Sequence, residues 1–108
     1  MKTTTNPARM RVHASEASGL LKALANEQRL LILCHLAEGE LTVGELLERL
    51  ELGQSALSQH LPNLREAALV QTRREAQAVH YRLATGPVQA LMATLHDIYC
   101  GKPAHGSR

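Results

Sequence analysis

LTVGELLERLELGQSALSQHLPNLREAAL, residues 41–69, has the pattern of two short amphipathic helices joined by a turn that contains glycine. Thr42 and Glu45 stand at capping-box spacing, which predicts a helix over 43–50. Residues 51–53 supply the turn, and a second helix follows it. Two short helices joined in this way indicate a helix-turn-helix. The inward-facing positions of the second helix are predicted to be Leu57, Leu61, Leu64 and Ala68.

Two further helices are predicted on the N-terminal side of this unit. The first covers residues 15–24. Asn26 is a good N-cap for the next, and Glu27 lies in its first turn, where the helix dipole favours a negative charge. Gly39 is expected to end it. Its apolar face is predicted to consist of Leu30, Leu33, Cys34 and Ala37.

On the C-terminal side the apolar residues change to a period of two. The alternation over 70–72 and 79–83 predicts a two-stranded β-hairpin with a polar tip at residues 74–78. A last helix is predicted to begin near Gly86 and Pro87, since proline is accepted at the first helical position. Its apolar face is predicted to be Val88, Leu91, Met92, Leu95, Ile98 and Tyr99.

The predicted fold is mainly α (α+β), with five helices and a two-stranded β-hairpin wing before the last helix. This is a winged helix-turn-helix, predicted over residues 13–100 between flexible tails at 1–12 and 101–108. A chain of 108 residues without Trp or Phe builds a thin core, which a homodimer would enlarge. No signal-peptide or membrane-spanning pattern is present, so a cytoplasmic location is expected, with no membrane partner and with reduced thiols.

The outward face of the second helix of the helix-turn-helix is polar, as a DNA-reading helix requires. Glutamine can pair bidentately with adenine, and serine can contact bases or phosphates. The wing carries Arg73, Arg74 and Arg82, which are candidate phosphate or minor-groove contacts. Each patch taken singly is also compatible with a solvated surface, but together they favour double-stranded DNA as a partner. The candidate reading residues are Gln54, Ser55, Ser58 and Gln59.

Pro62 complicates the reading helix. Proline in a helix interior removes the hydrogen bond to the carbonyl of Ser58 and costs roughly 3 kcal/mol. Either the helix continues past Pro62 with a kink, or it is short. Both alternatives are compatible with the sequence.

Three stretches together resemble the ArsR/SmtB family of winged-helix repressors from about Leu20 to Tyr99. They are LKALANEQRLLILCHL, ELTVGELLERLELGQSALSQHLPNLREAALV and TRREAQAVHYRL. The resemblance implies a homodimer, held by its first and last helices, that binds a palindromic operator and is not an enzyme. It also places His60 among the recognition-helix residues, beside Gln54 to Gln59.

The chain departs from the family pattern at Ala68, at Pro62, which is unusual in the reading helix, and at both of the common metal sites. Ala68 stands where the family usually has glycine, so a left-handed turn there would be strained. Thr42 and Gly44 occupy the positions of the Cys-x-Cys of metal-sensing members, and only His96-Asp97 remains of the other common metal site. No metal site and no cofactor are therefore predicted.

Two cysteines match a dithiol subgroup of that family. Cys34 lies within LxILCxL and Cys100 within LHxIYC, and in that subgroup the pair responds to reactive sulfur species or oxidants. This implies an inducer of that class, with the dithiol form bound to DNA and the bridged form released. His96 lies one turn before Cys100 and can tune its thiol. We expect Cys100 to attack first and Cys34, on an apolar helix face, to resolve.

Three other functions are compatible with the sequence. The chain could be a metal-responsive repressor that uses Cys34, Cys100 and His96, or a constitutive DNA-binding regulator with inert cysteines. A thiol enzyme is the third, but the chain contains no Cys-x-x-Cys to support it.

Overall fold

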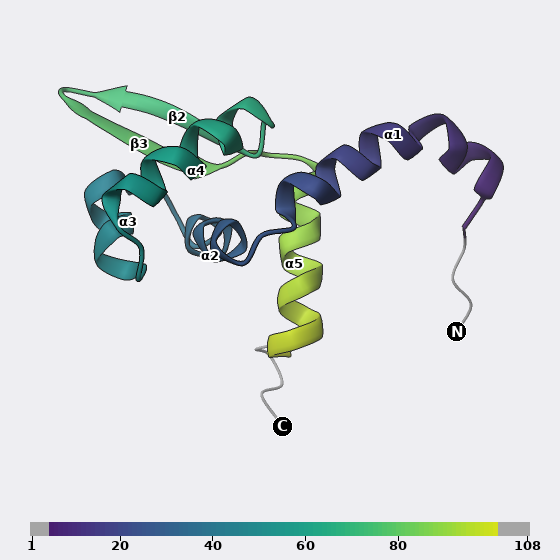
Figure 1. Ribbon diagram of the computed structural model, residues 1–108. Helices are drawn as coiled ribbons and strands as arrows, with labels where there is room; N and C mark the ends of the chain where they lie inside the picture. Colours follow the sequence, from purple (N-terminus) through teal and green to yellow (C-terminus); the bar gives the residue numbers. More distant parts are fainter. Residues whose placement is uncertain (1–4, 102–108) are drawn as a thin grey trace.

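A computed structural model of the chain describes residues 5–101 and shows a winged helix-turn-helix (Figure 1). The predicted five helices and the hairpin before the last helix are confirmed. One element was not predicted, a short strand ahead of the third helix. In chain order the elements are α1 (Pro7–Leu24), α2 (Glu27–Leu36), β1 (Leu41–Thr42), α3 (Val43–Arg49), α4 (Gln54–Glu66), β2 (Val70–Glu75), β3 (Ala78–Leu83) and α5 (Pro87–Cys100).

The two strands of the predicted hairpin, β2 and β3, belong to a three-stranded antiparallel sheet in the order β1-β3-β2. In the added strand, Leu41 pairs with Tyr81 and Thr42 with His80. A strand of two residues has no alternation to recognise, which explains why the sequence pattern missed it. The tip is also shorter than predicted, because Ala76 and Gln77 alone form the turn between β2 and β3.

The core is built from leucine, isoleucine, valine, methionine and alanine side chains, and all buried side chains in the described part of the chain are apolar. Leu41 and Leu46 flank the N-terminus of α3 and are both buried, as a hydrophobic staple requires. The capping box itself is present between Thr42 and Glu45. The largest fully buried side chains are Ile32, Leu33, Leu46, Leu57, Leu64 and Leu69.

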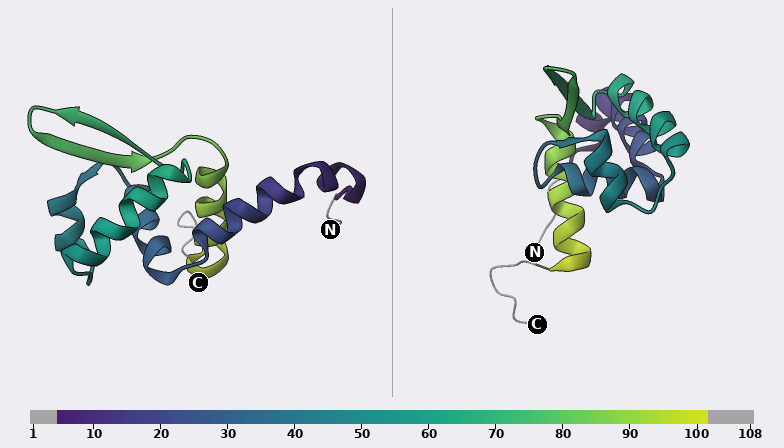
Figure 2. Two further views of the ribbon diagram at one scale, coloured as in Figure 1. Left: turned by 45° about the horizontal axis from the view of Figure 1, so that its top comes forward. Right: turned by 90° about the vertical axis from the view of Figure 1, so that its left-hand side faces the viewer.

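Helix α1 begins at Pro7 and not at the predicted residue 15, so residues 7–12 of the predicted tail are helical. Asn6 caps it by accepting a hydrogen bond from the Arg9 backbone N–H, and Pro7 occupies the first turn. The helix extends away from the rest of the fold in Figure 1 and in the left view of Figure 2, and Leu24 is its one buried residue. Residues 1–4 and 102–108, which belong to the predicted tails, lie outside the described residues.

Ala68 was predicted to lie on the inward face of α4, and this prediction is wrong. The residue lies exposed just beyond the end of the helix. Its φ of 62° is left-handed, and the Leu69 N–H donates back to the Leu64 carbonyl at 2.9 Å. This is the Schellman arrangement that normally takes glycine. The strain expected from the sequence at Ala68 is therefore present.

Candidate DNA-binding surface and thiol groove

Helix α4 places its polar residues outward. Leu57, Leu61 and Leu64 are buried on its inner side. Its N-cap is Gly53, which has no side chain to bond the N–H groups of the first turn. Those groups are available to a phosphate, and the exposed side chains lie beside them. The four predicted reading residues, Gln54, Ser55, Ser58 and Gln59, are all exposed.

Helix α4 continues through Pro62 to Glu66, so the alternative of a short reading helix is wrong. Pro62 is exposed, and the core leucines on either side of it, Leu61 and Leu64, stay buried. The missing hydrogen bond to the Ser58 carbonyl therefore falls on the solvent side, where water can replace it.

His60 is half-buried, and its Nε2 lies 2.8 Å from Oε1 of Gln28. Gln28 belongs to α2, so this contact joins the reading helix to the helix that carries Cys34. Because the amide oxygen only accepts, this hydrogen bond requires the tautomer in which Nε2 carries the proton. The sequence did not single out Gln28, since it lies 32 positions from His60.

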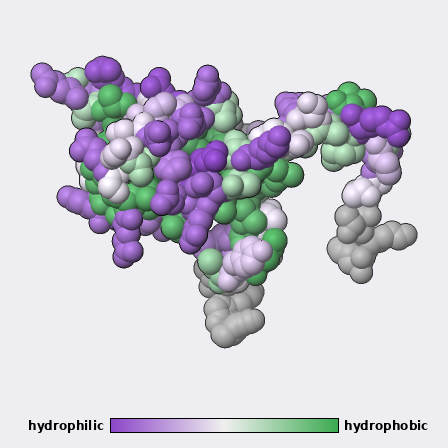
Figure 3. All heavy atoms as spheres, viewed as in Figure 1, coloured by the Kyte–Doolittle hydropathy of each residue, from purple (hydrophilic) through white to green (hydrophobic). Residues whose placement is uncertain are grey.

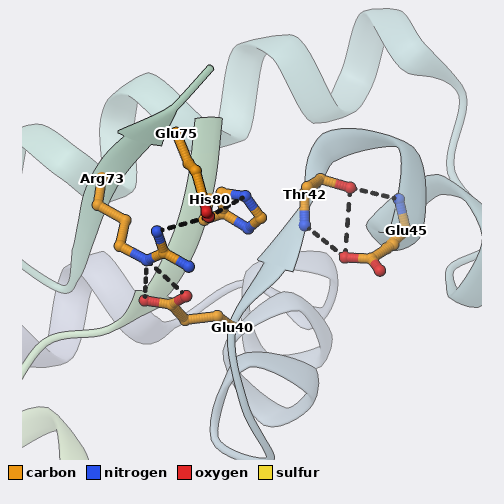
Figure 4. A network of polar contacts seen from close by, with 6 residues as sticks. All are labelled: Glu40, Thr42, Glu45, Arg73, Glu75 and His80. Atoms are coloured by element: carbon orange, nitrogen blue, oxygen red, sulfur yellow. Dashed lines mark hydrogen bonds and ion pairs between the residues drawn. The ribbon is translucent and has the colours of Figure 1, made fainter. Parts of the chain in front are cut away.

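The three wing arginines differ in their surroundings. Arg73 Nε lies 2.9 and 3.1 Å from the two carboxylate oxygens of Glu40, and Nη1 lies 3.0 Å from Oε1 of Glu75 (Figure 4). These hydrogen bonds, first to Glu75 and then to Glu40, raise the pKa of the Arg73 guanidinium. Arg74 and Arg82 are exposed, and in residues 5–101 neither forms an ion pair.

His80 adds a weaker contact to this network, with its Nε2 3.8 Å from the Glu75 carboxylate. The hydrogen bond from Arg73 lowers the pKa of Glu75, and the charges of Arg73 and His80 lower it further. Glu75 is therefore ionised at neutral pH. The acidic partners Glu40 and Glu75 were not singled out from the sequence, which predicted Arg73 only as a DNA contact.

Cys34 was predicted to lie on an apolar, buried helix face, and this prediction is wrong. Its thiol is exposed. The buried residues of α2 are Ile32, Leu33 and Leu36, which turns Cys34 toward α5. There it lines a groove of about 470 Å³ between the two helices. The full lining consists of Cys34, Ala37, Glu38, Leu83, Gln89, Met92, Ala93, His96 and Asp97.

Cys100 is the last residue of α5 and is also an exposed free thiol. It follows His96 by one turn, but it is not among the residues that line the groove of Cys34. The structure thus brings His96 and Cys34 to one groove, with Cys100 on the same helix as His96. In residues 5–101 no three His, Cys, Asp or Glu side chains gather in a way that could hold a metal ion.

Among residues 5–101 no helix is both long and apolar enough to cross a lipid bilayer.

Comparisons with known proteins by sequence and by structure all identify bacterial transcriptional regulators as similar to this chain. The sequence pattern described as "Bacterial regulatory protein, arsR family" matches residues 26–72. The chain is 55% identical over 95 residues to the transcriptional activator HlyU of Vibrio cholerae, covering 88% of each protein. It is 47% identical over 91 residues to the biofilm growth-associated repressor of Agrobacterium fabrum, covering 84% of this chain and 78% of that protein. The crystal structure of the repressor BigR from Xylella fastidiosa superposes with a TM-score of 0.83 at 39% identity, over 91% of this chain and all (100%) of that one.

Proposed function

The chain belongs to the ArsR family of bacterial regulatory proteins, and from that membership we propose that it is a homodimeric, DNA-binding repressor controlled by its two thiols. In this proposal the dithiol form binds operator DNA. Reactive sulfur species or oxidants bridge Cys34 and Cys100, and the bridged form releases the DNA.

The exposed polar face of α4 is the observation that carries DNA binding. Gln54 and Ser55 lie in the first turn, beside backbone N–H groups that Gly53 leaves uncapped. A helix N-terminus of this kind can hold a phosphate while its side chains reach base edges. Arg74 and Arg82 on the wing add positive charge without an internal partner in the described residues. The relatives are transcriptional regulators, which supports this function over an enzymatic one.

Apolar surface on α1 and α5 supports a homodimer. Figure 3 shows hydrophobic surface on both of these helices. Large apolar side chains that stay exposed to this extent usually mark an interface. Two reading helices in a dimer would meet half-sites about 34 Å apart on a palindromic operator. The exposed residues are Met10, Val12 and Leu21 on α1, and Ile98 and Tyr99 on α5.

The groove between α2 and α5 supports thiol sensing. Cys34 and His96 both line it, so the groove holds a thiol together with a base of the kind that can take a thiol proton or stabilise a thiolate. Cys100 lies one turn further along α5. The exposure of Cys34 removes the reason for ranking it second, and either thiol can make the first attack.

The bridging chemistry balances for either class of inducer. A thiolate that attacks the outer sulfur of a persulfide RSSH releases RS⁻ and becomes Cys–SSH. The second thiolate then attacks the cysteine sulfur and expels HS⁻, which leaves a disulfide. With peroxide the first product is a sulfenic acid, and the second thiolate expels hydroxide. If another RSSH first converts the second cysteine to Cys–SSH, its terminal sulfur attacks the cysteine sulfur of the first persulfide and expels HS⁻, which leaves a trisulfide bridge.

Release from DNA is the step that links the inducer to transcription. Relatives named as repressors support repression here, and HlyU is named as an activator. Both kinds of regulator lose their effect when they leave DNA, so the proposed switch fits either sign of regulation. A reporter on the regulated promoter, compared with and without this protein, distinguishes repression from activation.

The test combines operator binding with intact mass on the same samples. A duplex selected by the wild-type chain from a random-sequence pool serves as operator, and the protein is used reduced, after polysulfide and after peroxide. We expect tight binding of the reduced form and weak binding of the bridged form, with whole sulfur atoms gained after polysulfide. Cys34→Ser and Cys100→Ser are the matched controls and should bind equally before and after treatment. Equal affinity of reduced and bridged wild-type protein would falsify the mechanism.

A further inference from the structure

The outer face of the wing carries polar side chains from all three strands. Arg73 on β2 lies opposite His80 on β3, and His80 lies opposite Thr42 on β1. Side chains of directly opposed residues share one face of a sheet. Val70 and Leu83, which form the pair three positions away, are buried on the other face. Arg73 and His80 therefore lie on the side of the sheet that faces away from the core.

Arg73 reaches from β2 across this face to Glu40, the residue before β1. Its Nε is shared by both Glu40 oxygens at 2.9 and 3.1 Å, and its Nη1 contacts Glu75 at 3.0 Å (Figure 4). A guanidinium held by two carboxylates in this way is better fixed than a single surface ion pair. The Glu40 side chain is also partly shielded, at 29% exposure. The contact joins the hairpin to the strand that leads into the helix-turn-helix.

Strand β1 is in turn fixed to α3 by the capping box. Thr42 Oγ1 accepts from the Glu45 N–H at 3.2 Å, and Glu45 Oε1 accepts from the Thr42 N–H at 2.9 Å (Figure 4). Glu40 lies two residues before Thr42, so one short segment holds both the wing and the first helix of the reading unit. Beyond His80 the hairpin has no third strand beside it in the described residues, because β1 pairs only with Tyr81 and His80.

We propose that Glu40 is a positioning residue for DNA binding. Through Arg73 it sets the angle of the wing relative to α4, so that Arg74 and Arg82 reach the DNA backbone. The inference rests on the proposed DNA-binding function. Arg73 itself is occupied by two carboxylates, and this cluster carries more negative than positive charge at neutral pH. It holds the wing and does not contact phosphate.

The Glu40→Gln variant distinguishes a positioning role of Glu40 from a purely electrostatic effect on DNA binding, because the two predict opposite changes in affinity. Removing a negative charge near DNA should tighten binding if charge alone acts. If Glu40 positions the wing, binding of the selected duplex weakens instead, by about twofold to fivefold, the effect of losing an exposed ion pair. Glu48→Gln on α3 is the matched control: an exposed glutamate with no side-chain hydrogen bond or ion pair in residues 5–101. It should bind as tightly as wild type or more tightly.

Salt dependence shows which arginine meets phosphate. Each lost phosphate contact lowers the slope of log affinity against log salt by about 0.9. We expect that loss for Arg74→Gln or Arg82→Gln. Arg73→Gln should weaken binding by the same factor as Glu40→Gln and should lower the slope no more than Glu40→Gln does, because both variants release the wing in the same way. The Glu40→Gln/Arg73→Gln double variant should bind no more weakly than either single variant, because both remove one contact.

Backbone ¹⁵N relaxation gives a readout that is independent of DNA. In Glu40→Gln the amides of residues 74–79 should become more mobile while those of α3 and α4 keep the wild-type values. Tighter binding by Glu40→Gln, or a salt slope clearly lower in Arg73→Gln than in Glu40→Gln, overturns the inference, since Arg73 would then be a phosphate contact that Glu40 competes for. A wild-type chain that selects no DNA at all overturns the proposed function, and the inference with it.

Discussion

The Nε2 atom of His60 lies 2.8 Å from Oε1 of Gln28, and this hydrogen bond joins the reading helix α4 to α2. Helix α2 also carries Cys34, six positions after Gln28. Both residues lie on one continuous helix of ten residues. If bridging of Cys34 in the proposed switch shifts α2, we expect this contact to change the orientation of His60, and through it that of α4.

Substitution of Gln28 by alanine should weaken this coupling. The hydrogen bond between the exposed Gln28 and the half-buried His60 contributes about 1 kcal/mol, or a factor of about five in an equilibrium constant. We expect the ratio of operator affinities of the reduced and bridged forms to fall by up to that factor in Gln28→Ala. Glu27→Ala, one position earlier and exposed, is the control and should leave the ratio unchanged. An unaltered ratio in Gln28→Ala would show that α2 and α4 communicate by another route.

Replacement of Ala68 by glycine should stabilise the fold. Ala68 has a φ of 62°, and a left-handed conformation costs a residue with a Cβ roughly 1 kcal/mol. Glycine removes that strain, although it gains entropy in the unfolded chain, so we expect a net gain of about 0.5 kcal/mol in the free energy of unfolding by urea.

Ala67→Gly is the matched control for Ala68. Ala67 is exposed and adjacent, but its φ is −80°, which alanine adopts without strain. Glycine there should destabilise the fold by about 0.5–1 kcal/mol. The same sign of change at both positions would contradict the account of strain at Ala68.

A charge on the apolar surface of α5 should separate the proposed dimer. Ile98 is 63% exposed in a single chain. Burying a new carboxylate in an interface without a partner is costly, so Ile98→Glu should sediment as a monomer and bind the selected duplex at least tenfold more weakly. Gln77→Glu at the wing tip adds the same charge and should remain dimeric. A dimeric Ile98→Glu would place the interface elsewhere.

Acid should destabilise the fold through two carboxylates. The backbone hydrogen bond from Thr42 lowers the pKa of Glu45, and the hydrogen bond from Arg73 lowers that of Glu75. A carboxyl group whose pKa falls on folding stabilises the fold above its unfolded pKa, and this contribution is lost as the pH drops through the folded pKa. We expect the free energy of unfolding to decline as the pH falls below about 4.3.

Urea unfolding at neutral and acidic pH checks this expectation. Glu45→Gln and Glu75→Gln should each lose less stability on acidification than the wild-type chain. Glu48→Gln, which lacks such hydrogen bonds in the described residues, should follow the wild-type curve. If all three variants follow that curve, the two hydrogen bonds do not control acid sensitivity.

Features set by local chemistry could be predicted from the sequence. The capping box at Thr42 and Glu45, the Asn26 N-cap and the proline start of α5 each depend on residues within one helical turn. The outward face of α4 was predicted correctly because its leucines recur at a clear helical spacing. The family pattern predicted the strain at Ala68.

Features that depend on distant partners could not be predicted. Residues 30–34 contain apolar side chains at nearly every position, so their pattern did not define which side of α2 faces the core, and Cys34 was placed on the wrong side. Strand β1 exists because β3 lies beside it, and Arg73 meets Glu40 across 33 positions of sequence. A charged side chain alone does not reveal whether its partner is DNA or a carboxylate of the same chain.

The exposure of helix α1 makes the folding of this protein depend on its concentration in the cell. It runs over 18 residues yet buries only Leu24 within its own chain. Most of the stability of a helix in a protein comes from tertiary packing of its apolar face. In the proposed dimer the packing comes from a second copy, which makes the order of α1 subject to mass action. The concentration of the regulator then determines how much of it is completely folded and able to reach DNA.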